Sequence, residues 1–174
     1  GAGQDIRLDF DRKKDTSSTV EASRNFANKL WNATKFVLIN KTFNNNYSLN
    51  ESDETSLELC DKWILSKLNQ VNIKVAALLK EYKLGESAKL LYEFTWNDFC
   101  DWYVEVSKPR MTDSEDKETC LAVQDICIRQ ILLLLHPFTP FITEELWSLL
   151  GYANGKTIQE FSPGKGADLL KKLS

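Results

Sequence analysis

The sequence predicts an all-α fold, an antiparallel bundle of helices joined by short polar segments. Apolar residues recur at steps of three and four along the long central stretches, which is the period of an amphipathic helix. Glycine, proline or clusters of Asn and Ser separate these stretches. Only residues 4–10 (QDIRLDF) alternate apolar and polar side chains as a strand does, and no second segment of this kind offers itself as a partner.

Size and composition fit one globular domain. The chain has 174 residues, of which 43% are hydrophobic and 27% charged, so it can bury a substantial core. Its net charge of −3 argues against a general nucleic-acid binder, and no apolar run is long enough to cross a bilayer. We therefore expect no DNA or membrane partner and a cytoplasmic protein in which Cys60, Cys100, Cys120 and Cys127 are reduced.

The first helix is predicted over residues 17–40, where a step of 100° per residue produces two different faces. Ser17 or Ser18 is expected to cap this helix, with Glu21 as the capping-box partner. One face is apolar and should pack into the core. It carries Phe26, Ala27, Leu30, Ala33, Thr34, Val37 and Leu38, with Val20 and Trp31 at its edge.

The opposite face of this helix has the chemistry of a surface that binds unpaired RNA. It combines cations, amides and one aromatic ring, in Arg24, Asn25, Asn28, Lys29, Asn32, Lys35 and Phe36. Phosphates attract Arg and Lys, and splayed bases offer their edges to Asn amides. Residues 17–41 carry a local charge of +3, although the whole chain is acidic. The alternative is a solvated helix face, and Phe36 could either stack on a base or cover the loop that follows.

Two further helices are predicted after a polar, Asn-rich loop at residues 41–56. The second helix spans 54–82, and Gly85 breaks its apolar pattern. The third helix spans 86–107 and should end at Pro109, because proline lacks the backbone N–H that a helix interior requires.

The fourth and fifth helices are predicted over residues 114–135 and 141–150. Ser114 should cap the fourth helix, whose far end is apolar nearly all round and is therefore expected to be buried. Pro140 should open the fifth helix and Gly151 should end it.

The chain divides by composition into three parts: a linker (1–16), the helical bundle (17–151) and an exit segment (152–174) in which a last helix could start at Asp168. The chain opens with three small residues, and its single methionine is Met111. We therefore expect a piece excised from a longer protein.

No catalytic or metal-binding residue is predicted. Asp98, Asp101 and Glu105 share one face of the third helix, and without a neighbouring His or Lys motif an exposed acidic face is the simpler interpretation. The single histidine, His136, is expected to cap the fourth helix at its C-terminus. We expect packing roles for Trp63, Trp96, Trp102 and Trp147, and stabilisation of the last helix dipole by Glu144 and Glu145.

Three stretches together resemble the helical anticodon-binding domain of class I aminoacyl-tRNA synthetases. They are RNFANKLWNATKFVL (24–38), YEFTWNDFCDWYVEVSKP (92–109) and LLLLHPFTPFITEELW (132–147). The last motif is shared by the valine, isoleucine, leucine and methionine branches, whereas the first resembles the valine branch, as does GQDIRL (3–8). One departure is FSP (161–163), where the family often has Trp-Pro.

The resemblance implies a domain that binds the anticodon arm of a valine-accepting tRNA. A catalytic domain elsewhere in the full-length enzyme would activate valine with ATP and magnesium. Its His-Ile-Gly-His and Lys-Met-Ser-Lys-Ser signatures are not among these residues, so we expect this fragment to be inactive alone and to need no cofactor. The same domain of an isoleucine or other class I synthetase, and a helical module that binds an acidic protein, remain alternatives.

Overall fold

The computed structural model describes residues 12–41, 56–112 and 114–153. These residues form helices and no strand, which confirms the all-α prediction. The helices are α1 (Arg12–Asn40), α2 (Leu59–Lys80), α3 (Leu84–Glu93), the π-helix η2 (Phe94–Tyr103), α4 (Val104–Ser107), the 3₁₀-helix η3 (Lys108–Thr112), α5 (Ser114–Leu135) and α6 (Pro140–Leu149).

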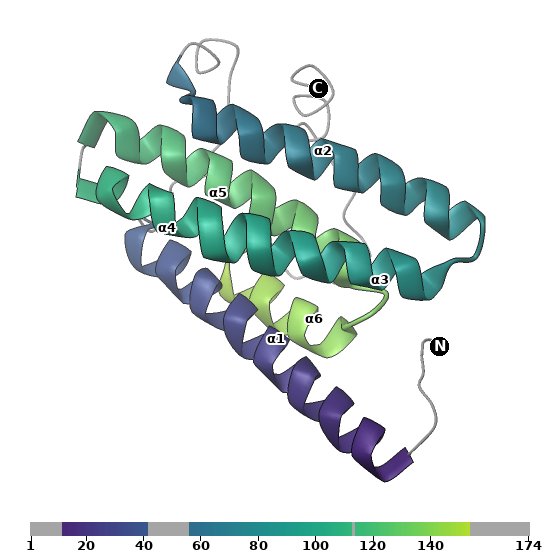
Figure 1. Cartoon of the computed structure of the whole chain (residues 1–174). Helices are drawn as coiled ribbons and strands as arrows, with labels where there is room; N and C mark the ends of the chain where they lie inside the picture. Colours follow the sequence, from purple (N-terminus) through teal and green to yellow (C-terminus); the bar gives the residue numbers. More distant parts are fainter. Residues whose placement is uncertain (1–11, 42–55, 113, 154–174) are drawn as a thin grey trace.

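The helices pack as a bundle with one oblique member. In Figure 1, α2, α5 and the segment from α3 to α4 lie side by side, while α1 crosses them at an angle with α6 beside it. Contacts join α1 to η2, α5 and α6. One face of α1 is therefore covered in its C-terminal half, from Phe26 to Val37, and the opposite face stays open.

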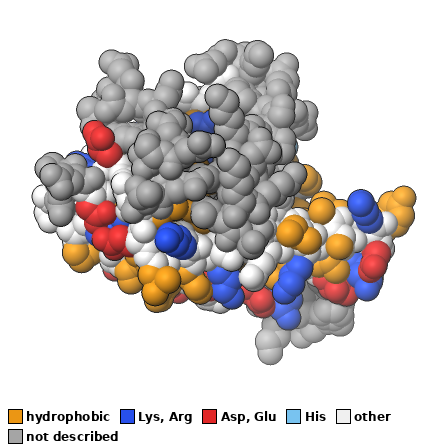
Figure 2. All heavy atoms as spheres, turned by 90° about the horizontal axis from the view of Figure 1, so that it is seen from above, with side chains coloured by type: hydrophobic (Ala, Val, Ile, Leu, Met, Phe, Trp, Pro, Cys, Tyr) orange, Lys and Arg blue, Asp and Glu red, His pale blue; other side chains and the backbone are white. Residues whose placement is uncertain are grey.

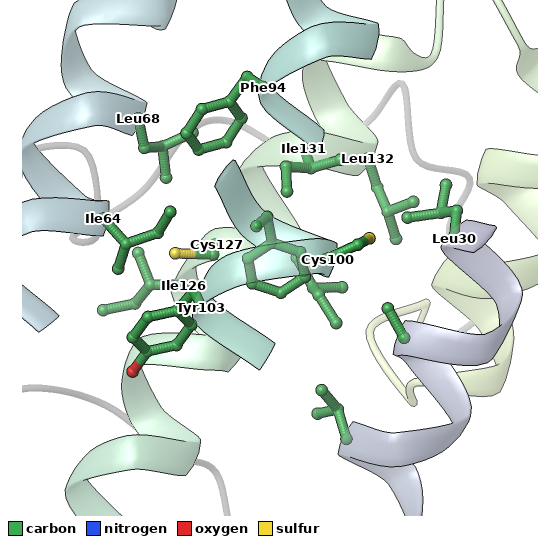
Figure 3. Packing of buried hydrophobic residues seen from close by; sticks show 14 of the residues in the cluster. Leu30, Ile64, Leu68, Phe94, Cys100, Tyr103, Ile126, Cys127, Ile131 and Leu132 are labelled. Carbon is green, nitrogen blue, oxygen red and sulfur yellow. The ribbon is translucent and has the colours of Figure 1, made fainter. Parts of the chain in front are cut away.

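The core forms where α1, α2, η2 and α5 meet (Figure 3). Its buried side chains include Leu30, Ile64, Leu68, Phe94, Cys100, Tyr103, Ile126, Cys127, Ile131 and Leu132. The described cysteines are free thiols, as predicted. Burial raises the pKa of Cys100 to about 12 and that of Cys120 to about 11, so both stay protonated and serve as packing residues.

The start of α1 corrects the sequence prediction. The helix begins at Arg12, so Ser17 and Ser18 lie inside it and do not cap it with Glu21. The basic run at residues 12–14 consists of good helix formers, which allow the helix to extend by more than a turn. Residues 12–16, which we assigned to the linker, are therefore helical.

The helix α2 is shorter than predicted at both ends. Its N-cap is Glu58, whose backbone N–H donates to the Asp61 carboxylate at 2.9 Å. At the other end Tyr82 adopts a left-handed conformation (φ 59°), and the Lys83 N–H donates to the Leu78 carbonyl at 2.9 Å. The chain thus turns at Tyr82, and Gly85, which we expected to break the helix, lies in the first turn of α3.

The predicted third helix is confirmed in extent but not in kind. Helical structure runs without a break from α3 through η2 to α4, and the middle of it is a π-helix. The α-helical part ends at Ser107, just before Pro109, as predicted, and the chain continues through the proline as the 3₁₀-helix η3. A proline needs no hydrogen bond to its own nitrogen in the first turn of such a helix.

The helix α5 has the predicted bounds, and α6 begins at Pro140 as predicted. Gly151 takes a φ of 83° after α6, and the Tyr152 N–H donates to the Trp147 carbonyl at 3.1 Å. The rings of Trp147 and Tyr152 pack edge to face with their centroids 4.9 Å apart. These features form a Schellman cap with its apolar contact.

Arg110 on η3 links α2 to α5 from a buried position. Its guanidinium donates two bonds to Asp61, at 2.6 and 2.9 Å, and two to Asp116, at 2.6 and 2.7 Å. The hydroxyl of Tyr103 donates to Asp61 at 2.5 Å. The bonds from Arg110 hold the pKa of Asp116 below its ordinary value, so both carboxylates are paired with one cation.

Candidate nucleic-acid interface

The open face of α1 carries five of the seven side chains predicted to contact RNA. Arg24, Asn25, Asn28, Asn32 and Lys35 are all exposed. The opposite face is covered as predicted, with Phe26, Leu30, Ala33, Thr34 and Val37 buried. Burial of this apolar face fixes the helix against the core, and therefore fixes the direction in which the polar side chains project.

The two most accessible cations of this face have no carboxylate partner among the described residues. Neither Arg24 nor Lys35 forms an ion pair within the ranges that the structure describes. Instead, the ammonium of Lys35 lies 5.9 Å from the ring centroid of Trp31, which is itself half-buried against the core. A cation held over a ring remains positively charged and available to a phosphate.

The remaining two predicted residues, Lys29 and Phe36, are engaged at the seam between α1 and the segment η2–α4. Lys29 forms an ion pair with Asp101, and its ammonium lies 5.0 Å from the ring centroid of Trp96. Phe36 is half-buried, and the ammonium of Lys108 lies 5.8 Å from its ring centroid. We call Lys29, Phe36, Trp96, Asp101, Glu105 and Lys108 the seam residues.

Asp101 and Glu105 of the third helix are exposed, as predicted, and each is paired with a lysine. Asp101 pairs with Lys29 of α1, and Glu105 pairs with Lys108 at 2.7 Å. Asp98 lies elsewhere: it is half-buried, burial raises its pKa, and Lys67 of α2 opposes that rise. The three acids therefore do not form one solvated face, and two of them neutralise cations at the seam.

The π-helix explains how two side chains of η2 reach one lysine. Trp96 and Asp101 are five residues apart, and in an α-helix such residues point about 140° away from each other. A π-helix closes its hydrogen bonds between residues five apart, so these residues lie nearly above one another. Trp96 and Asp101 consequently share a side and both contact Lys29.

Sequence reasoning missed Trp96 and Lys108 as members of this surface, and assigned Asp101 and Glu105 to a different role. The signal available was the run of acids on the third helix opposite the cations of the first. That pattern does not reveal which acid meets which cation, because the relative register of the two helices depends on the tertiary packing.

The other residues considered in the sequence analysis lie outside the open face of α1. The Nδ1 atom of His136 lies 2.8 Å from Oγ1 of Thr143, so the side chain joins the end of α5 to α6. Glu144 and Glu145 lie beyond the first turn of α6, which contains no acid, so the predicted dipole role is wrong. Trp147 is fully buried and Trp63 packs on Trp102 at 4.4 Å between centroids, as expected for packing residues.

A cavity of about 700 Å³ lies away from this polar face. It opens between the N-terminal half of α1, Tyr92 and residues 138–142. Its lining contains aromatic, aliphatic and hydroxyl side chains and no charged one, so it does not extend the cationic surface.

One further face of the described residues is electrostatically mixed. In the face shown in Figure 2, blue cationic and red anionic side chains alternate with orange apolar ones. Among the described residues, no three His, Cys, Asp or Glu side chains are grouped so that they could hold a metal ion. The helices described are also too short or too polar to span a membrane. The open face of α1 is therefore the candidate interface.

Comparison with known proteins identifies the family of the chain. The family model for the anticodon-binding domain of tRNA ligase matches residues 61–171. Among curated relatives, a valine–tRNA ligase of Prochlorococcus marinus subsp. pastoris is 68% identical over 152 residues, which cover 86% of this chain and 17% of the relative. The valine–tRNA ligase of Synechocystis is 51% identical over 164 residues, 90% of this chain and 18% of the relative.

More distant relatives carry the same name. The valine–tRNA ligase of Gloeobacter violaceus is 47% identical over 150 residues, covering 86% of this chain and 17% of the relative. The chain thus spans less than a fifth of the length of the relatives it matches. The matched family, the helical fold and the motifs agree, and the chain belongs to the family of anticodon-binding domains of tRNA ligases.

Proposed function

We propose that this chain is the domain of a valine–tRNA ligase that binds the anticodon arm of a valine-accepting tRNA through the open face of α1. One observation carries the proposal: α1 exposes Arg24 and Lys35 without carboxylate partners among the described residues, in a domain of this family. The valine–tRNA ligases among its relatives support the choice of tRNA.

Each kind of side chain on this face has a separate task. Arg24 and Lys35 bind phosphates, whose attraction is strong but carries no sequence information. Asn25, Asn28 and Asn32 donate to and accept from the exposed edges of bases in the loop. The ring of Phe36 stays half-buried at the seam and offers its remaining surface to a loop base. The core holds these groups in one orientation, so that the RNA does not have to order them.

In the full-length enzyme, this contact orients the tRNA so that its acceptor end reaches a catalytic domain that attaches valine in an ATP-dependent reaction. ATP and magnesium act there, and none of the RNA contacts proposed for this chain uses them. Residues 1–16 connect to that catalytic domain, residues 17–151 bind the RNA, and residues 152–174 lead towards further sequence. The enzyme works in the cytoplasm.

The direct test is binding of the chain to RNA by fluorescence anisotropy at low salt. A labelled valine-accepting tRNA transcript is compared with the same transcript in which only the anticodon is replaced. The proposal predicts tighter binding to the transcript with the valine anticodon, by about 1–3 kcal/mol per lost base contact. Equal affinities for the two transcripts, or no binding to either, would contradict it.

Two further measurements separate the alternatives. An unrelated acidic protein should not displace the tRNA, whereas a helical module for acidic proteins would release it. Aminoacylation by the full-length protein should proceed with valine and not with isoleucine, so efficient charging with isoleucine would assign the chain to the sibling branch.

A further inference from the structure

Lys29 differs from the other cations of the polar face because a carboxylate of the chain already occupies it. Its partner Asp101 comes from η2, a different element, and both side chains remain accessible, with 33% of the Lys29 side chain and 47% of the Asp101 side chain exposed. An RNA phosphate can therefore reach the same ammonium. A phosphate at this ammonium would lie beside the Asp101 carboxylate, whose negative charge opposes its binding.

The two contacts of Lys29 depend on an unusual backbone conformation in η2. Trp96 and Asp101 meet Lys29 together only because η2 is a π-helix, which is a rare element and is often found at functional positions. The ring of Trp96 lies 5.0 Å from the ammonium and contacts it independently of the carboxylate. If the carboxylate were absent, the ring would still keep Lys29 in place at the border of the open face of α1.

We propose that Asp101 is an intramolecular competitor of RNA phosphate for Lys29, and so a determinant of how tightly and how selectively the domain binds RNA. The inference rests on the proposed function of α1. Asp101 is tethered beside the cation, so it acts at a high effective concentration. A phosphate that binds Lys29 either displaces this carboxylate or lies beside it. Both cost affinity, so RNAs that gain little from other contacts bind more weakly.

The competition predicts the direction in which a substitution of Asp101 changes the affinity for RNA. Asp101→Asn removes the competing charge and leaves an amide of the same shape, so Lys29 becomes available and RNA binding becomes tighter. The gain is expected to be about two- to fivefold, the range of an exposed ion pair. The dependence of affinity on salt should also steepen, by up to about 0.7 in the slope of log K against log salt.

The experiment measures the affinity of the 174-residue chain for a valine-accepting tRNA transcript by fluorescence anisotropy at several salt concentrations. The variants are Asp101→Asn, Lys29→Met and the double variant. Glu81→Gln is the matched control, because Glu81 is an equally ion-paired carboxylate, 3.1 Å from Lys83, at the turn between α2 and α3. Circular dichroism verifies that each variant keeps its helices.

The competitor role predicts a gain for Asp101→Asn that exceeds the gain for Glu81→Gln and disappears when Lys29 is Met. A loss of affinity in Asp101→Asn would overturn it, because Asp101 would then contact RNA directly. An equal gain in Glu81→Gln or in the Lys29→Met background would overturn it as well, since the effect would be one of net charge. If the unmodified chain binds no tRNA, the proposed function falls and the competitor role falls with it.

Discussion

Arg110 shows what single residues do in this domain, because one buried cation balances two carboxylates from different helices. Arg110→Met is expected to lower the free energy of unfolding by about 3–5 kcal/mol at pH 7, since the variant leaves Asp61 buried and unpaired. Urea unfolding followed by circular dichroism measures this loss. Lys80→Met, which removes an exposed cation, should change stability by less than about 0.5 kcal/mol.

The same pair of variants tests the pH dependence at the residue scale. The pKa of Asp116 is lowered in the folded state, so its contribution is present above the ordinary value of 3.8 and is lost as the pH falls through the lowered folded value. The free energy of unfolding of Arg110→Met should therefore approach that of the unmodified chain as the pH is lowered from 7 to 3. A deficit that stays constant over this range would show that Asp116 is not stabilised by Arg110.

At the scale of elements, the end of α2 stores backbone strain. Tyr82 holds a left-handed φ of 59° while 89% of it is exposed, so its ring gains little to offset the strain. Tyr82→Gly should raise the free energy of unfolding by about 0.5–1 kcal/mol, because glycine adopts this conformation freely. Tyr82→Ala is the control: it removes the ring but keeps the strain, and should give no gain. Thermal and urea unfolding measure both variants. Equal changes in the free energy of unfolding for Tyr82→Gly and Tyr82→Ala would contradict the account.

The elements also show which features local sequence can predict. The apolar stripe of α1, the bounds of α5 and the caps of α6 depend on residues near one another in the chain, and these predictions are confirmed. The π-helix was not predicted, because its hydrogen bonds depend on contacts with α1 and α2 that come from distant sequence. For the same reason the Arg110 network and the pairing of Lys29 with Asp101 could not be read from periodicity.

For the candidate site, the exposure of Arg24, Asn25, Asn28, Asn32 and Lys35 was predictable from helical spacing alone. The positions of Lys29 and Phe36 were not. Both lie at the border of the polar arc, where a change of a few degrees in packing decides between solvent and a neighbouring helix. Three parts of the chain lie outside the described residues: residues 1–11, residues 42–55 of the loop predicted over 41–56, and the exit segment from residue 154.

At the scale of the whole molecule, charge is distributed so that binding is local. The chain carries a net charge of −3, yet residues 17–41 carry +3. Of their four cations, Arg24 and Lys35 project from the open face of α1, whereas Lys29 and Lys41 pair with Asp101 and Asp125. Under the proposed function, this charge distribution orients an RNA towards one helix. The acidic remainder, together with Asp101 and Glu105 at the seam, restricts where a polyanion can settle.

The most direct measurement of this account compares two charge reversals of equal size. Lys35→Glu changes the open face of α1, and Lys74→Glu changes an exposed lysine of α2 that likewise has no ion-pair partner among the described residues. The affinity of each variant for a valine-accepting tRNA transcript is measured by anisotropy over a series of salt concentrations. The account predicts that Lys35→Glu weakens binding at least tenfold and reduces the salt slope by about 0.7 or more, whereas Lys74→Glu has little effect. Equal losses in the two variants, or no loss in Lys35→Glu, would contradict the claim that the open face of α1 binds the RNA.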